Sequence, residues 1–114
     1  MGILINNISY SNTIFYGKTY RNLEYINCNF NDVNFNNCKF ENVLFRQCNL
    51  TNISFNSCVF YDTYIQNYSK LINVYFGKNI NFNNILDFSS AMTSNILFEH
   101  VYKSVRELLY QIYE

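Results

Sequence analysis

The sequence predicts an all-β solenoid, a parallel β-helix of square cross-section, followed by a C-terminal α-helix. Every fifth position carries a bulky residue: Ile5, Tyr10, Phe15, Tyr20, Tyr25, Phe30, Phe35, Phe40, Phe45, Leu50, Phe55, Phe60 and Ile65. Two positions earlier runs a column of mostly smaller residues: Ile3, Ile8, Thr13, Lys18, Leu23, Cys28, Val33, Cys38, Val43, Cys48, Ile53, Cys58 and Thr63. A strict period of five fits neither the 3.6-residue helix nor the two-residue alternation of a strand. Five residues therefore form one side of a coil, and both columns point inward.

A third column marks the corners of the predicted square. The residues two after each bulky one are almost all Asn, Asp, Gly or Ser: Asn7, Asn12, Gly17, Asn22, Asn27, Asp32, Asn37, Asn42, Gln47, Asn52, Ser57, Asp62 and Asn67. These residue types stabilise turns through their side chains or their backbone freedom. Stacked coils would then hydrogen-bond as parallel strands about 4.8 Å apart.

With these columns the chain resembles the pentapeptide-repeat family, whose pattern is loosely Ala-Asp/Asn-Leu-x-x. The segments 28–32, 38–42 and 58–62 match this pattern, with Cys in place of Ala and Phe in place of Leu. The match is strong over 23–65 and weaker over 1–22, because Lys18 occupies an inward position. The resemblance implies a right-handed quadrilateral β-helix, a hand that also follows the crossover rule for parallel strands.

The regular beat ends after Ile65, and a looser pattern follows. Apolar pairs recur with a spacing of six at Val74-x-Phe76, Ile80-x-Phe82 and Leu86-x-Phe88. We interpret residues 66–93 as a distorted last coil with one extra corner residue per side. The predicted β-helix domain is therefore residues 1–93.

Residues 94–114 are predicted to form an amphipathic helix. Apolar residues three and four apart give it a seam, formed by Phe98, Val101, Val105, Leu108 and Ile112. Because solenoid ends need caps, this helix covers the C-terminal end of the coil or, as in some proteins of the family it resembles, makes a homodimer.

Composition limits the function classes. The formal net charge is zero and 14% of residues are charged, so there is neither the basic excess of a nucleic-acid binder nor the acidic excess of a DNA mimic. No apolar run is long enough to span a membrane, and the N-terminus lacks the pattern of a signal peptide. We expect a soluble cytoplasmic protein without direct contact to nucleic acid or membrane.

The four cysteines are the obvious candidates for special chemistry. In a twenty-residue coil Cys28 stacks on Cys48, and Cys38 stacks on Cys58 on the opposite side. Their spacing differs from the C-x2-4-C pairs of metal sites, and they share their column with Val and Ile. We therefore favour reduced core thiols over stacked disulfides or a metal site, and predict no cofactor. No catalytic arrangement can be built around His100, the one histidine, so an enzyme is not expected.

The outward residues divide the predicted rod into two halves. Two sides carry mostly Asn, Ser and Thr, whereas the other two carry charged and large apolar residues. Mixed apolar, aromatic and Arg surface is typical of binding sites. The candidate protein-binding patch comprises Ile26, Leu44, Arg46, Val59, Tyr61 and Tyr64. The alternative is that residues 66–93 or the helix fold over this half and bury it.

The leading functional prediction is a non-catalytic protein-interaction module with a protein partner. The resemblance to the pentapeptide-repeat family implies an alternative, protection of a type II topoisomerase (DNA gyrase) by an acidic rod that mimics DNA, which the neutral surface weakens. A second alternative is a secreted or phage-type effector that binds a protein in another cell.

Overall fold

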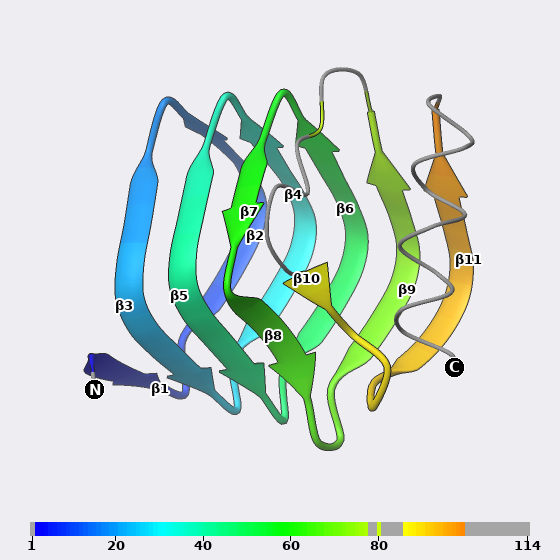
Figure 1. Cartoon of the computed structure of the whole chain (residues 1–114). Helices are drawn as coiled ribbons and strands as arrows, with labels where there is room; N and C mark the ends of the chain where they lie inside the picture. The colour runs from blue at the N-terminus through cyan, green and yellow to red at the C-terminus, as the bar shows by residue number, and fades with distance from the viewer. Residues whose placement is uncertain (1, 78–79, 81–85, 100–114) are drawn as a thin grey trace.

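The computed structural model describes residues 2–77, 80 and 86–99, and these form a parallel β solenoid of about four coils (Figure 1). The predicted fold class, a quadrilateral parallel β-helix, is confirmed. The strands are β1 (Ile3–Asn6), β2 (Ser9–Tyr16), β3 (Thr19–Ile26), β4 (Asn29–Asn36), β5 (Lys39–Arg46), β6 (Asn49–Asn56), β7 (Val59–Tyr61), β8 (Thr63–Gln66), β9 (Lys70–Phe76), β10 (Leu86–Asp87) and β11 (Met92–Phe98).

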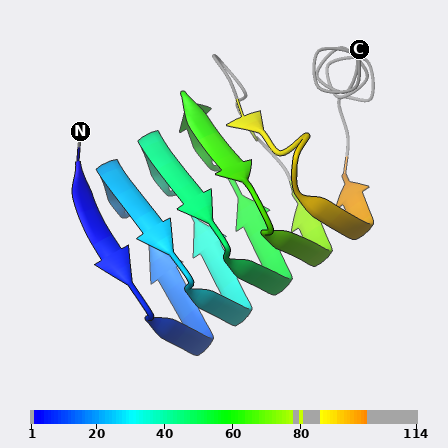
Figure 2. The same ribbon diagram turned by 90° about the horizontal axis from the view of Figure 1, so that it is seen from below.

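The strands form two parallel sheets that face each other across the core. Sheet A has the order β1-β3-β5-β8-β10, with β7 also beside β5, and sheet B has the order β11-β9-β6-β4-β2. Partners in the regular coils are twenty residues apart, as in Tyr10↔Phe30 and Phe30↔Leu50. The full-length strands bend at a corner, so each sheet covers two sides of the square. Figures 1 and 2 show the strands stacked from β1 and β2 at one end to β11 at the other.

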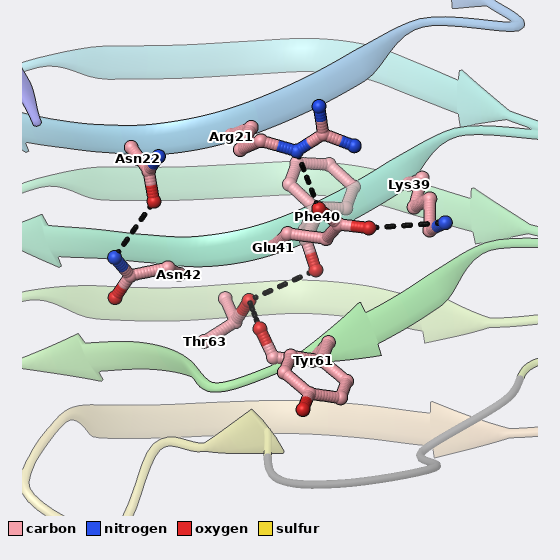
Figure 3. Close-up of polar contacts among 8 residues, drawn as sticks. All are labelled: Arg21, Asn22, Lys39, Phe40, Glu41, Asn42, Tyr61 and Thr63. Carbon is pink, nitrogen blue, oxygen red and sulfur yellow. Dashed lines mark hydrogen bonds and ion pairs between the residues drawn. The ribbon is translucent and has the colours of Figure 1, made fainter.

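The corner column adopts the left-handed backbone conformation throughout. All thirteen predicted corner residues, from Asn7 to Asn67, have φ between 38° and 67°. Asn, Asp and Gly tolerate this conformation better than other residues, because a short polar side chain or a missing Cβ lowers its steric cost. Corner amides also bond from coil to coil, with Asn42 Nδ2 donating to Asn22 Oδ1 at 2.8 Å (Figure 3).

The core consists of aromatic ladders parallel to the solenoid axis. In one ladder the centroids of successive rings are 5.0–5.3 Å apart with interplanar angles of 9–18°, through Phe15, Phe35, Phe55, Phe76 and Phe98. Neighbouring ladders meet edge to face, as Phe55 and Phe60 do at 5.2 Å and 75°. Such ring pairs contribute about 0.5–1.5 kcal/mol each beyond the area they bury.

The predicted extra corner residue on every side after Ile65 is wrong between Ile65 and Phe76, whereas the predicted spacing of six fits Val74 and Leu86, which lie two residues further apart than two regular sides. One extra residue is inserted at a single corner, where Asn67 and Tyr68 both have positive φ. The five-residue beat then resumes, so Leu71 pairs with Leu50 and Phe76 with Phe55. There is thus no extra residue on each side through β9. A longer step follows, because Leu86 pairs with Thr63, 23 residues earlier. Phe82 lies outside the described residues.

The predicted start of the helix at residue 94 is also wrong, because residues 94–98 belong to strand β11. Ile96 pairs with Val74, and Phe98 stacks on Phe76 with centroids 5.0 Å apart, so both continue the inward columns of the solenoid. The solenoid therefore extends past residue 93. The rest of the predicted helix seam, Val101, Val105, Leu108 and Ile112, lies outside the described residues.

Truncating a ring in the middle of a ladder should cost more stability than truncating one in the first coil. We expect Phe55→Ala to lower the free energy of unfolding by about 3–5 kcal/mol, because it removes a buried ring with neighbours on both faces. Phe15→Ala should cost clearly less, because Phe15 is only half-buried. Urea unfolding of both variants measures the difference, and equal losses would contradict a continuous ladder.

Candidate protein-binding face

The outer face of sheet A brings the six predicted patch residues together. The register places Leu44 beside Tyr64 and Ile26 beside Arg46 on one side of the square. On the adjoining side Val59 and Tyr61 continue the columns of Lys39 and Glu41. We call this cluster the sheet A patch: Ile26, Leu44, Arg46, Val59, Tyr61 and Tyr64. Its role in binding remains a prediction.

The sheet A patch is only partly open to solvent. The side chain of Tyr61 is 47% exposed, and the other five residues are half-buried. In the described part of 66–93 the chain continues the coil, with β9 paired to β6 and β10 to β8, on the side of each stack that faces away from β1 and β2. These strands therefore do not cover β3 and β5, as the alternative prediction required. Residues 100–114 lie outside the described part.

The charges beside the patch pair with one another. Arg21 Nε donates to Glu41 Oε2 at 2.5 Å, and Lys39 Nζ lies 3.0 Å from Glu41 Oε1 (Figure 3). Arg46 Nη2 donates to Glu24 Oε2 at 2.5 Å. Hydrogen bonds from Arg21 and then Lys39 lower the pKa of Glu41 from 4.5 to about 2. On β3 and β5 the carboxylates thus meet cations, and the face presents little net charge.

Sequence reasoning found the charges on this face but not their pairing. The signal was available, because Arg21 and Glu41 are twenty residues apart and so share one column of a twenty-residue coil. It also missed the outward residues of β9 and β11, such as Met92 and Leu97, which are 66% and 54% exposed. The five-residue spacing of Leu71 and Phe76 would have located β9.

The outward columns of sheet B are neutral over β4 and β6, as the sequence predicts, and the charged residue on these strands is the exposed corner residue Asp32. Its outward side chains are Asn29, Asn31, Asn34, Asn36, Asn49, Thr51, Ser54 and Asn56. Some of these amides bond from coil to coil, with Asn49 Nδ2 donating to Asn29 Oδ1 at 2.8 Å. Further along the sheet, β9 adds the charged residue Lys70.

The four cysteines are buried free thiols in the inward columns. Each Sγ lies within hydrogen-bond distance of two backbone carbonyls; Cys58 Sγ is 3.3 Å from Phe35 O and 3.4 Å from Asn56 O. In the next coil Ser69 takes the place of a thiol above Cys48. Its Oγ accepts a hydrogen bond from the backbone N–H of Cys48 at 3.1 Å. Burial raises the pKa of Cys48 to about 11 and that of Cys58 to about 12.

The described residues also bear on membrane insertion and on metal binding. They contain no helix long and apolar enough to cross a membrane. Within the same residues no group of three or more His, Cys, Asp or Glu side chains is placed to hold a metal ion.

Comparison with known proteins shows which proteins have a similar repeat. A family model described as pentapeptide repeats, with nine copies, matches residues 25–67. Among solved structures, the pentapeptide repeat protein Rfr23 from the cyanobacterium Cyanothece 51142 is 9% identical, with 84% of this chain and 88% of that chain covered and a TM-score of 0.40. Trypsin-treated QnrB1, a plasmid-mediated fluoroquinolone resistance protein, is 17% identical over 82% of this chain, with a TM-score of 0.38. This chain spans 54% of that QnrB1 chain. No curated protein matches the chain described here.

The thiols should be unreactive while the chain is folded. We expect no reaction of Cys48 and Cys58 with a disulfide reagent at pH 8, because only the thiolate reacts and burial holds both pKa values near 11–12. All four thiols should react in denaturant. An exposed thiol ionises near pH 9.0, so these groups stabilise the fold fully below that pH and progressively less as the pH rises toward 11.

Rapid labelling of the native chain would contradict this account, and so would a loss of stability on adding a metal chelator.

Proposed function

We propose that the chain is a non-catalytic protein-interaction module built on pentapeptide repeats, whose family model matches residues 25–67. The observation that carries the proposal is the sheet A patch. It combines an exposed tyrosine, Tyr61, with four half-buried apolar or aromatic neighbours in adjacent columns. Tyr and Arg are enriched in the centres of protein interfaces, where they supply much of the binding energy.

The pairing of charges indicates what kind of partner this face suits. Arg46 already pairs with Glu24, and Arg21 and Lys39 share the single carboxylate of Glu41. A highly charged partner would gain little, because it would have to compete with these intramolecular pairs. We infer a partner with an apolar or aromatic contact surface surrounded by neutral polar groups.

Protection of DNA gyrase by DNA mimicry is the alternative function that the family suggests. Mimicry of duplex DNA needs rows of unpaired negative charge, because the DNA backbone carries one charge about every 1.7 Å. The described faces carry instead paired carboxylates on β3 and β5, and on β4 and β6 neutral outward side chains with the single corner carboxylate Asp32. These observations favour a partner recognised by contact rather than by electrostatic mimicry.

The experiment is affinity capture from the native host followed by mass spectrometry, with variants on both sheets. We expect Tyr61→Ser combined with Tyr64→Ser to weaken binding of the captured partner at least about tenfold, because truncated interface tyrosines commonly cost 1 kcal/mol or more each. The control Tyr75→Ser changes a half-buried tyrosine on sheet B and should leave binding unchanged.

The variants must also keep the thermal midpoint of the wild type, since Tyr64 is half-buried. Unchanged binding by a stable double variant would overturn the proposal. A supercoiling assay with purified gyrase distinguishes the alternative, which predicts an effect of the chain that our proposal does not.

A further inference from the structure

We propose that the interior of the solenoid between its first two coils is a binding site for one water molecule, held by the hydroxyl group of Tyr20. A cavity of about 20 Å³ lies there, lined by the eight consecutive residues of the five-residue beat from Tyr10 to Phe45. The lining rings stack in pairs, from Tyr10 on Phe30 to Tyr25 on Phe45, with centroids 5.0–5.3 Å apart. Two successive turns of the coil therefore enclose the cavity.

The hydroxyl group of Tyr20 is the polar group that lacks a protein partner in this region. Its oxygen is buried, although the residue as a whole is half-buried, and it makes no hydrogen bond to the described residues. A buried hydroxyl without a hydrogen bond destabilises a fold, whereas phenylalanine in its place would not. The next two positions of this ladder are Phe40 and Phe60. Tyrosine at position 20 therefore points to a partner that the other coils do not need.

Two further hydroxyl groups belong to the same cavity. In the five-residue beat tyrosine occurs at positions 10, 20 and 25 and at no other, and all three line it. The hydroxyl is the part of a tyrosine farthest from the backbone, so an inward-pointing tyrosine carries it toward the axis. Burial raises the pKa of Tyr20, and the neighbouring Cys38, Tyr25 and Tyr10 raise it further. The three hydroxyl groups thus lie within electrostatic reach of one another.

The size and chemistry of the cavity select water as the ligand. A cavity holds a water molecule when its volume reaches about 10–15 Å³, so 20 Å³ admits one water and excludes an organic ligand. The lining consists of Tyr and Phe alone, and the raised pKa of Tyr20 keeps its hydroxyl neutral, so an ion finds no counter-charge. Purely apolar cavities stay dry, whereas buried waters occupy sites where about three polar groups can bond to them.

The bound water would connect the two sheets across the core. Tyr10 lies on β2 of sheet B, whereas Tyr20 and Tyr25 lie on β3 of sheet A. A water molecule can donate two hydrogen bonds and accept two, so it can bond to all three hydroxyl groups at once. It would therefore tie the half-buried rings Tyr10 and Tyr20 to the fully packed core that begins at Tyr25.

The direct test is a high-resolution crystal structure of the full chain and of its Tyr20→Phe variant. We expect an ordered water oxygen about 2.8 Å from Tyr20 Oη in the wild type, and its loss in the variant. A well-ordered wild-type structure without a water in this cavity would overturn the proposal. A side chain that occupies the cavity and bonds to Tyr20 Oη would overturn it as well.

Urea unfolding supplies an independent readout, in which the sign of the effect decides. Tyr20→Phe should raise the equilibrium constant for unfolding about threefold to tenfold, because it removes a satisfied buried hydrogen bond without changing the ring. The matched control is Tyr16→Phe, which removes the same atom from a 71% exposed tyrosine of the same coil and should leave the constant unchanged. A constant that stays the same or falls in Tyr20→Phe would contradict the proposal, because a hydroxyl without a partner costs stability.

Discussion

The whole structure depends on a residue in the left-handed conformation at every fifth position. The left-handed region costs an ordinary residue about 1–2 kcal/mol, which Asn, Asp and Gly largely avoid. Each such residue turns the chain by one corner, so that four corners close a coil of twenty residues. This spacing places rings twenty residues apart in one ladder up to Phe60, and residues added later lengthen the step to 21 residues for Phe76 and 22 for Phe98. The stacked core is therefore a consequence of corner chemistry as much as of hydrophobicity.

This geometry separates the residues that stabilise the fold from those available for function. Inward columns are filled by rings and small side chains, so the four cysteines act as small apolar groups with weak hydrogen bonds to carbonyls. Outward columns are free to vary. Sheet A uses them for paired charges and the sheet A patch, whereas β4 and β6 in sheet B carry Asn, Ser and Thr. A solenoid of this kind can thus acquire a binding face without altering its core.

Much of this architecture could be predicted from the sequence because the period is strict. The thirteen corners, the inward columns through Ile65 and the grouping of the patch residues on one face all follow from counting in fives and twenties. The prediction failed where the five-residue spacing is interrupted. One inserted residue at Asn67–Tyr68 shifted the register, and the strand β11 followed a longer step, so that Phe98 was assigned to a helix seam although it completes an aromatic ladder. The ion pairs of Glu24 and Glu41 depend on side-chain rotamers, which periodicity does not specify.

The most direct test of the corner requirement is the free energy of unfolding of variants at Gln47. This residue has φ of 54° and is the one corner in the regular repeat that is not Asn, Asp, Gly or Ser. Both variants keep the N–H that donates to Asn67 O at 3.0 Å. We predict that Gln47→Gly is neutral or stabilising by up to about 1 kcal/mol, whereas Gln47→Val is destabilising by more than about 1 kcal/mol, because a β-branched residue fits this conformation poorly. Equal stability of the two variants would contradict the account.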